Sequence, residues 1–161
     1  MLLRPGTQHS TKGTNEDLRL IVPMAQWLSA AGPKVPVLAR LRAGFDAVEL
    51  MAALDSLNEP GLPQLDSLIK LNPRCTDVVV LARRRDAAQA HRDHPRSCKR
   101  TAFWEQDVEV PGVQRRVRCV LRLLERAIDA GGQRLGAPEY ELDGWKTTLP
   151  DSVDAAAVIR L

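Results

Sequence analysis

Residues 35–71 read VPVLARLRAGFDAVELMAALDSLNEPGLPQLDSLIKL: a short apolar run, an amphipathic stretch and a second apolar run. The first run, residues 35–41, is rich in Val and Leu and lies between Gly- and Pro-containing segments, which is typical of a buried strand. Residues 46–57 place their apolar side chains on one helical face, and an Asn-Glu-Pro-Gly sequence ends that helix. Residues 67–71 predict a second strand. A strand, a helix and a strand with short connections predict a βαβ unit in a parallel sheet.

The segment before this unit predicts a loop followed by a helix. Residues 1–15 are polar, whereas residues 16–28 carry apolar side chains with helical periodicity. Thr14 or Asn15 is the expected N-cap. Pro23 is expected to interrupt the helix, and the Gly-Pro pair that follows is expected to end it.

The second half of the chain predicts mainly strands. Residues 75–90 predict a helix and residues 91–100 a polar loop. Residues 115–128 fit two periods, since apolar residues alternate with arginines as in a strand but also recur as in a helix. Residues 104–110 alternate in the same way and precede a Pro-Gly pair, which favours a hairpin, with a third strand near residues 140–147.

Composition points to one ordinary globular domain. The chain has 161 residues, of which 44% are hydrophobic and 27% charged, so a core is expected. Aromatic residues make up only 4%, which predicts a core of aliphatic side chains with Trp27, Trp104 and Trp145 as its large members. Aromatic platforms that stack on nucleic-acid bases are therefore not expected.

Several kinds of site and location are disfavoured. Three widely spaced cysteines, Cys75, Cys98 and Cys119, argue against a disulfide framework and are expected to be reduced. His91 and His94 with Cys98 could ligate a metal, but the arginines between them favour a solvated loop. The chain shows neither a signal peptide nor a membrane-spanning segment, which predicts a cytoplasmic protein with no membrane partner.

Positive charge is concentrated in the middle of the chain. The formal net charge is only +3, yet residues 81–126 contain twelve Lys or Arg against six Asp or Glu. Such a block could bind DNA phosphates, or it could be a solvated basic surface. The candidate DNA-binding residues are Arg83, Arg84, Arg85, Lys99, Arg100, Arg115, Arg116 and Arg118.

Four short segments resemble one family. Residues 3–14, LRPGTQHSTKGT, are similar to an RPGSQHxxKGT motif, and residues 40–46, RLRAGFD, to RLDSGFD. Residues 68–74, LIKLNPR, and residues 145–150, WKTTLP, are similar to FLIKxNxR and WxTSLP. These motifs, in this order, are those of bacterial insertion-sequence transposases of the DDE type, which have an RNase H-like catalytic domain.

The resemblance implies an α/β fold with an RNase H-like mixed sheet flanked by helices, here incomplete. Residues 1–98 would belong to the α/β core, residues 99–150 to a β-rich insertion, and residues 151–161 to the start of a truncated helix with Asp151-Ser152 as N-cap. Intact members use three carboxylates and two Mg²⁺ ions to cleave and join DNA strands.

The resemblance also implies that this chain lacks those carboxylates. The first Asp would lie upstream of residue 1 and the last Glu beyond residue 161, while Arg42 occupies the position of the second Asp. A permanent positive charge there would repel a cation. Asp46 is the nearest carboxylate, a weak candidate that is expected to cap the next helix. No cofactor and no metal site are expected.

Three interpretations follow. The first is a catalytically inactive, transposase-derived protein. The second is a DNA-binding or regulatory module, whose partner would be DNA such as transposon ends. The third is a product without function, whose unpaired sheet edges would leave it partly folded and prone to aggregate.

Overall fold

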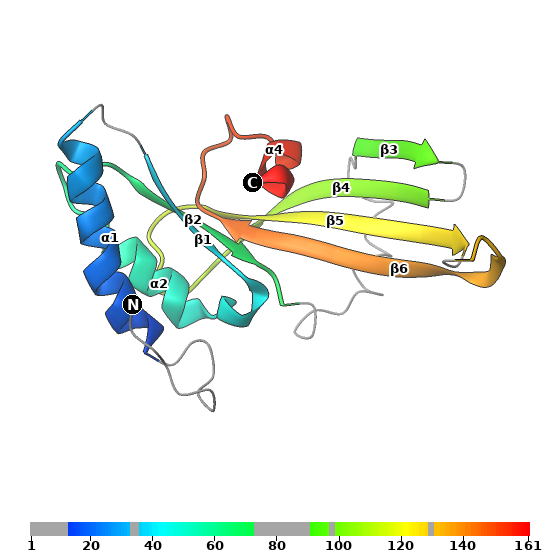
Figure 1. The fold of residues 1–161 in the computed structure, drawn as a ribbon, viewed down its shortest axis with the longest axis horizontal. Coiled ribbons are helices and arrows are strands. Elements are labelled where there is room, and N and C mark those ends of the chain that lie inside the picture. Colours follow the sequence, from blue (N-terminus) through cyan, green and yellow to red (C-terminus); the bar gives the residue numbers. More distant parts are fainter. Residues whose placement is uncertain (1–12, 33–35, 73–90, 97–98, 129–130) are drawn as a thin grey trace.

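The computed structural model describes residues 13–32, 36–72, 91–96, 99–128 and 131–161 (Figure 1). They form a mixed α/β fold in which helices flank one mixed sheet. The first half contains α1 (Thr14–Ala30), β1 (Val37–Leu41), a 3₁₀ turn η1 (Ala43–Phe45), α2 (Val48–Ser56) and β2 (Leu65–Lys70). The second half contains β3 (His91–Arg96), β4 (Lys99–Val108), β5 (Val117–Ile128), β6 (Arg134–Thr147) and α4 (Ala155–Arg160).

The six strands lie in the order β1-β2-β6-β5-β4-β3. β1 and β2 are parallel, with Val37 opposite Leu65, so the predicted βαβ unit is confirmed. All other neighbours are antiparallel, and β6 pairs with β2 through residues 68–70 and 145–147. The β-rich half therefore extends the same sheet that contains the βαβ unit.

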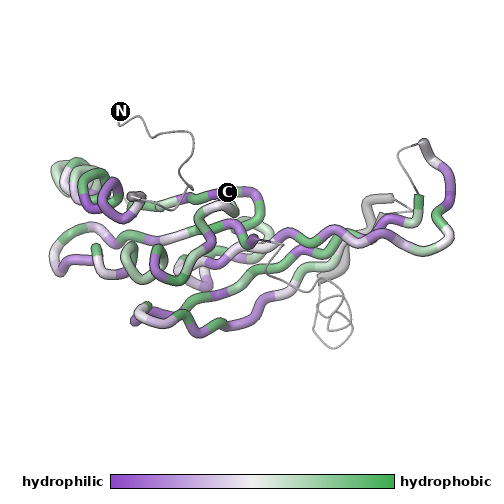
Figure 2. Tube along the Cα trace, turned by 90° about the horizontal axis from the view of Figure 1, so that it is seen from below, coloured by the Kyte–Doolittle hydropathy of each residue, from purple (hydrophilic) through white to green (hydrophobic). Residues whose placement is uncertain are grey.

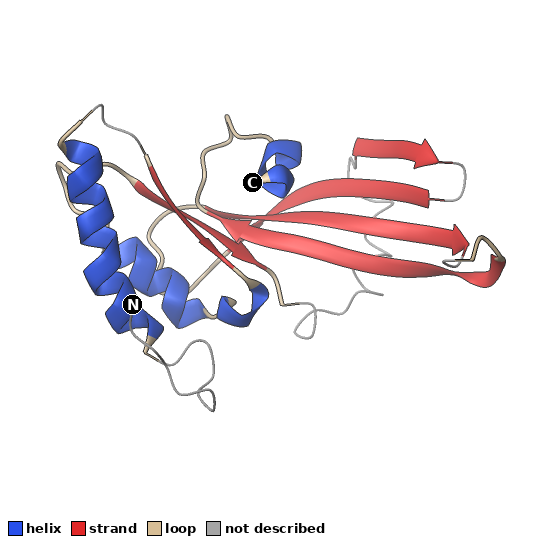
Figure 3. Ribbon diagram, in the orientation of Figure 1, coloured by secondary structure: helices blue, strands red, loops and turns tan. Residues whose placement is uncertain are grey.

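Helices cover the two faces of the sheet near β1 and β2. On one face, Ile69 of β2 packs with Met51 of α2 and Val22 of α1. On the opposite face, Leu68 of β2 packs with Val158 of α4. The far halves of β4, β5 and β6 extend beyond these helices, as the red strands in Figure 3 show. Successive side chains of β2 point to opposite faces of the sheet, and this alternation sets which face each helix covers.

The ambiguous segment 115–128 is a strand, as its neighbours favoured. β5 pairs with β4 on one side and with β6 on the other, and its first five residues are all buried. A strand covered on both faces needs apolar residues on both, which is why its pattern also fits a helix. The Pro-Gly turn of the hairpin is present, with Gly112 at φ 81°.

The predicted loop at residues 91–100 is wrong. Residues 91–96 form β3, which pairs with β4, and β4 begins at Lys99. β3 is the outermost strand of the sheet, and natural edge strands are often short and rich in charge or Pro. Its polarity therefore marks its edge position rather than a loop.

Two details of α1 differ from expectation. The helix begins at Thr14 with Gly13 as N-cap at φ 74°, so neither Thr14 nor Asn15 caps it. It also continues through Pro23 to Ala30. Gln26, one turn after the proline, is fully buried and donates from Nε2 to the Pro63 carbonyl at 3.1 Å, and this anchors the second half of the helix.

Other predictions are corrected near the ends of the described residues. Asp154, not Asp151 or Ser152, caps α4, and its carboxylate accepts a hydrogen bond from the Ala157 amide at 2.6 Å. Trp104 and Trp145 are buried as expected, but Trp27 is 67% exposed and does not belong to the core. The helices predicted at residues 16–28 and 46–57 are confirmed as α1 and α2. The helix predicted at residues 75–90 lies outside the described residues.

Candidate functional site

The carboxyl ends of the parallel strands β1 and β2 meet at one end of the sheet. Ligand sites of α/β proteins commonly lie at this position. Arg42 follows β1 in an extended conformation and is exposed, and Lys70 is the last residue of β2. The register places Leu41 opposite Ile69, so Arg42 and Lys70 are the next pair along these strands.

Asp46 lies at this end too, but its carboxylate is fully engaged. The side chain is 4% exposed. Its Oδ1 accepts a hydrogen bond from Lys146 Nζ at 2.7 Å, and its Oδ2 accepts one from the backbone N–H of Asn72 at 2.8 Å. The expectation that Asp46 caps α2 is wrong, because Ala47 is the N-cap and has no side-chain cap. Asp46 instead joins the start of α2 to the ends of β2 and β6.

Asp143 of β6 forms the second carboxylate centre. It accepts from Arg122, and Lys70 Nζ lies 3.1 Å from its Oδ1. Burial alone would raise the pKa of Asp143, but hydrogen bonds from Arg122 and Lys70 outweigh burial and lower it. A lowered folded-state pKa means that this carboxylate stabilises the fold above its ordinary pKa, and that the contribution is lost as pH falls through the folded value.

Both cations around Asp143 also lie over an aromatic ring. Lys70 Nζ is 5.8 Å and the Arg122 guanidinium carbon 6.0 Å from the centroid of Trp145. These distances are within the range of cation–π attraction. The ring is almost buried, with 8% exposure, whereas 45% of the Lys70 and 37% of the Arg122 side chain are exposed. The cations are thus held in place and still face solvent.

A surface of excess positive charge results, which we call the strand-end cluster: Lys70 and Arg122, which are paired with Asp143, together with Arg40 and Arg42. β1 turns Val37, Ala39 and Leu41 toward α1 and α2, so Arg40 projects to the face of Lys70 and Arg122. Within the part of the chain that the structure describes, Arg40 and Arg42 are exposed and have no carboxylate partner. Lys70 and Arg122 thus share one carboxylate, and Arg40 and Arg42 add further positive charge on the same face of the sheet.

The same end of the sheet does not fit a pair of Mg²⁺ ions. Such ions require several carboxylate oxygens free to ligate. Asp46 and Asp143 are each held by Lys or Arg side chains, and Arg42 adds an exposed positive charge directly after β1. Among the described residues, no group of three or more His, Cys, Asp or Glu side chains could hold a metal ion.

Among the residues that the structure describes, one thiol, that of Cys119, lies in the sheet near this site. Cys119 of β5 lies opposite Lys146 of β6 and is buried. Burial raises the pKa of Cys119 to about 11, although Lys146 partly opposes the shift. The thiolate, which is the reactive form, is therefore rare at neutral pH.

The arginines singled out from the sequence lie elsewhere, beside the turn between β4 and β5. Arg115 donates from Nε to Asp55 at 2.7 Å and from Nη1 to Asp66 at 3.0 Å. Both carboxylates are buried, with 7% side-chain exposure. Nη2 donates to the Leu65 carbonyl at 2.8 Å and to the Thr148 hydroxyl at 3.4 Å. Arg115 thus links the turn to α2 and β2.

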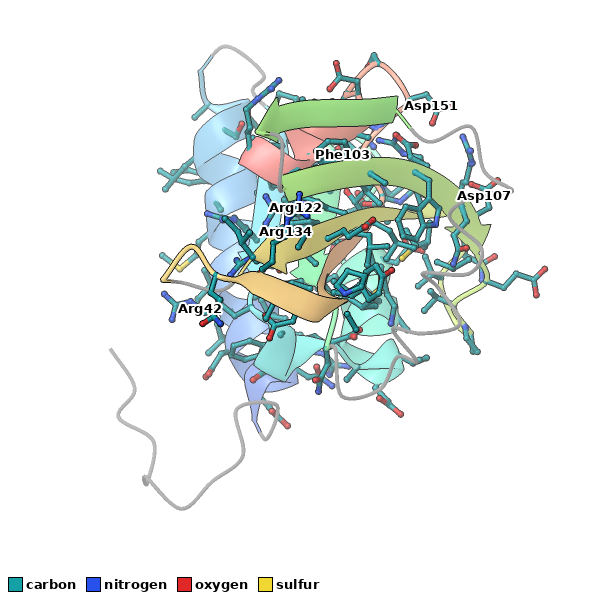
Figure 4. All side chains as sticks on the ribbon, turned by 90° about the vertical axis from the view of Figure 1, so that its right-hand side faces the viewer. Arg42, Phe103, Asp107, Arg122, Arg134 and Asp151 are labelled. Atoms are coloured by element: carbon teal, nitrogen blue, oxygen red, sulfur yellow. The ribbon has the colours of Figure 1, made fainter. Side chains whose placement is uncertain are left out.

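Arg116 and Arg118 are also paired. Arg116 contacts Asp107 and Asp151 on the surface, and these carboxylates raise its pKa. Arg118 is 2% exposed and donates to Glu105 at 2.8 Å and to two backbone carbonyls before α4. A cavity of about 330 Å³ is lined by all three arginines. Figure 4 shows Asp107 and Asp151 on the side of the molecule opposite Arg42.

The group formed by Arg115, Arg116 and Arg118 contacts more carboxylates than it contains arginines. This excess of negative charge disfavours the binding of a phosphate. Lys99 and Arg100 begin β4, where their backbone pairs with Arg126 and Glu125 of β5. Arg83, Arg84 and Arg85 lie outside the described residues, as does the region around Cys98. The structure therefore brings Arg115, Arg116 and Arg118 together but separates them from the exposed cations of the strand-end cluster.

Arg40 and Lys70 were missed as candidate binding residues by sequence reasoning. Both residues belong to the motifs that carry the family resemblance, and those motifs assign them no binding role. A usable signal existed, because apolar residues alternate with Arg40 and Arg42 in the first strand and Lys70 ends the next one. Cations at the carboxyl ends of two adjacent parallel strands must lie side by side.

No described helix has the length and apolar character needed to cross a membrane. Comparisons of the chain with protein-family models, with curated proteins and with solved structures found no match.

Proposed function

We propose that this protein is a catalytically inactive relative of the DDE transposases that binds DNA phosphates through the strand-end cluster. The observation that carries the proposal is the excess of exposed positive charge at the carboxyl ends of β1 and β2. Two of these cations, Arg40 and Arg42, are not neutralised by any described carboxylate. Phosphate contacts of this kind give affinity that depends on salt and little on sequence.

The placement of the family-like segments supports the transposase origin. Residues 40–46, 68–72 and 145–147 are far apart in the sequence but lie on neighbouring strands near one end of the sheet. Asp46 contacts the Asn72 amide and, 100 residues away, Lys146. An RNase H-like domain gathers its catalytic groups on neighbouring strands in the same way, and here the gathered groups are mainly basic.

The lack of catalysis is one testable part of the proposal. Incubation of the protein with Mg²⁺ or Mn²⁺ and supercoiled or transposon-end DNA is expected to give no nicked or joined product on a gel. The reason is that Arg42 replaces a required carboxylate and that Lys146 holds Asp46. Metal-dependent nicking that disappears in an Asp46→Asn variant would contradict this part.

DNA binding is the second testable part. Replacing Arg40 and Arg42 together by Gln is expected to weaken binding to duplex DNA about tenfold or more at low salt. It should also reduce the slope of log K against log salt by roughly two, one per lost phosphate contact. Fluorescence anisotropy with a labelled duplex between about 50 and 200 mM salt measures both quantities.

The matched control is the double variant Arg116→Gln, Arg126→Gln. These arginines are also exposed, with 54% and 49% side-chain exposure, but they are paired with carboxylates. Their loss removes the same formal charge and should change the affinity and the salt slope much less. Equal effects of the two double variants, or binding by the wild type that is insensitive to salt, would refute the role of the strand-end cluster.

A further inference from the structure

Helix α1 has a large apolar surface that faces solvent. Five side chains are exposed between 62% and 67%: Leu20, Ile21, Met24, Trp27 and Leu28. α1 lies at the outer margin of the molecule, where Figure 2 shows hydrophobic residues, in green, along the coil at the left. Isolated exposed apolar residues are common in monomers, but a contiguous group of this size marks an interaction surface.

The opposite side of α1 is anchored to the core. Val22 is 4% exposed and packs with Met51 and Leu54 of α2. Gln26 is fully buried and donates to the Pro63 carbonyl. These contacts fix the rotation of the helix, so the exposed apolar surface is a defined feature of the fold.

The apolar residues are symmetric about Met24. Leu20 and Ile21 lie four and three residues before it, and Trp27 and Leu28 lie three and four residues after it. At about 100° per residue, Leu20 and Trp27 fall on one side of Met24 and Ile21 and Leu28 on the other. A surface with this symmetry is complementary to itself when a second helix runs antiparallel across it.

We propose that α1 pairs with α1 of a second copy of this chain about a two-fold axis that passes beside Met24. This arrangement places Met24 against Met24 of the partner subunit. It also places Leu20 against Trp27 of the partner subunit, and Ile21 against Leu28 of the partner subunit. The interface is isologous, so it closes at a dimer.

Area and charge both suit this occupant. The five side chains expose on the order of 600 Å², close to the roughly 800 Å² that each partner buries in a stable complex. From Leu20 to Ala30 the helix contains no charged residue. Pairing therefore buries apolar area without the cost of removing a charge from water.

Charge substitutions at Met24 test the proposal directly. Sedimentation velocity from about 1 to about 100 µM is expected to show a wild-type dimer that dissociates on dilution. Met24→Glu and Met24→Lys should each be monomeric, because two like charges would meet on the axis. An equimolar mixture of the two variants should form a dimer again, because unlike charges then meet.

Glu and Lys both favour helix, and Met24 is 66% exposed, so both variants should retain the wild-type circular dichroism spectrum. Tyr140→Glu is the matched control, since Tyr140 is also an exposed large side chain but lies on β6, and it should remain dimeric. A wild type that stays monomeric, single variants that both stay dimeric, or a mixture that stays monomeric would each overturn the proposal.

Discussion

Replacing Arg115 by Ala is expected to lower the free energy of unfolding by about 3–5 kcal/mol, a large part of the stability of a domain this size. The guanidinium is the partner of two buried carboxylates, Asp55 and Asp66. Without it both carboxylates stay buried with no opposite charge, and the side-chain bonds from the β4–β5 turn to Asp55 of α2 and Asp66 of β2 are lost. Urea unfolding followed by circular dichroism measures the change.

Arg116→Ala is the control for this prediction. Arg116 is the next residue and also contacts two carboxylates, but all three side chains are more than half exposed. Exposed ion pairs of this kind contribute little to stability, because water and salt screen the attraction. Adding Asp55→Asn and Asp66→Asn to the Arg115→Ala variant should restore part of the loss. If Arg115→Ala and Arg116→Ala have similar effects, the buried carboxylates do not depend on Arg115.

Leu68→Ala is expected to cost about 2–5 kcal/mol, because its side chain is fully buried and its removal leaves a cavity. The cavity would open below α4, whose buried residue Val158 packs on Leu68 together with Val120 and Trp145. α4 has only six residues, so this packing holds it on the sheet. Amide exchange at the end of α4 should therefore accelerate more than exchange in α2.

Leu38→Ala is the matched control for this second prediction. It removes the same atoms from the neighbouring strand β1, where Leu38 is 36% exposed. Its cost should stay below about 1 kcal/mol. A small effect of Leu68→Ala, or unchanged exchange in α4, would mean that the short helix does not rest on this face of the sheet.

Local pattern was sufficient to predict much of the fold. The run at residues 35–41, the helical face of 46–57 and the strand at 67–71 each carry one clear period, and the structure has all three elements. The Pro-Gly pair correctly indicated the hairpin. In these segments the spacing of apolar residues directly reflects which side chains meet the core.

Features that depend on contacts with other elements could not be predicted from local pattern. β3 has a polar sequence and exists through its backbone pairing with β4. Trp27 has the residue type of a core member, but the rotation of α1 is decided by Val22 and Gln26. Asp46 has the residue type of a cap, whereas its partners are the backbone amide of Asn72, just after β2, and Lys146 of β6.

The candidate site was only partly predictable for the same reason. The family-like motifs drew attention to Arg42, whose exposed position at the end of β1 fits a binding residue. A count of charges along the sequence could not distinguish Arg118, which is buried and paired, from Arg40, which is exposed and unpaired among the described residues. That distinction depends on strand register, which sets where each carboxylate lies.

The pairing of β2 with β6 has a consequence for how the chain folds. Thr147 of β6 donates its hydroxyl to the carbonyl of Ser67, 80 residues earlier, and these strands are neighbours in the sheet. Such long loops must close before the contact is gained, which slows folding. During synthesis, β2 leaves the ribosome long before its partner exists, and its apolar edge stays open until residue 147 has emerged. The βαβ unit is thus synthesised early, yet its place in the sheet is completed only when β6 has been made.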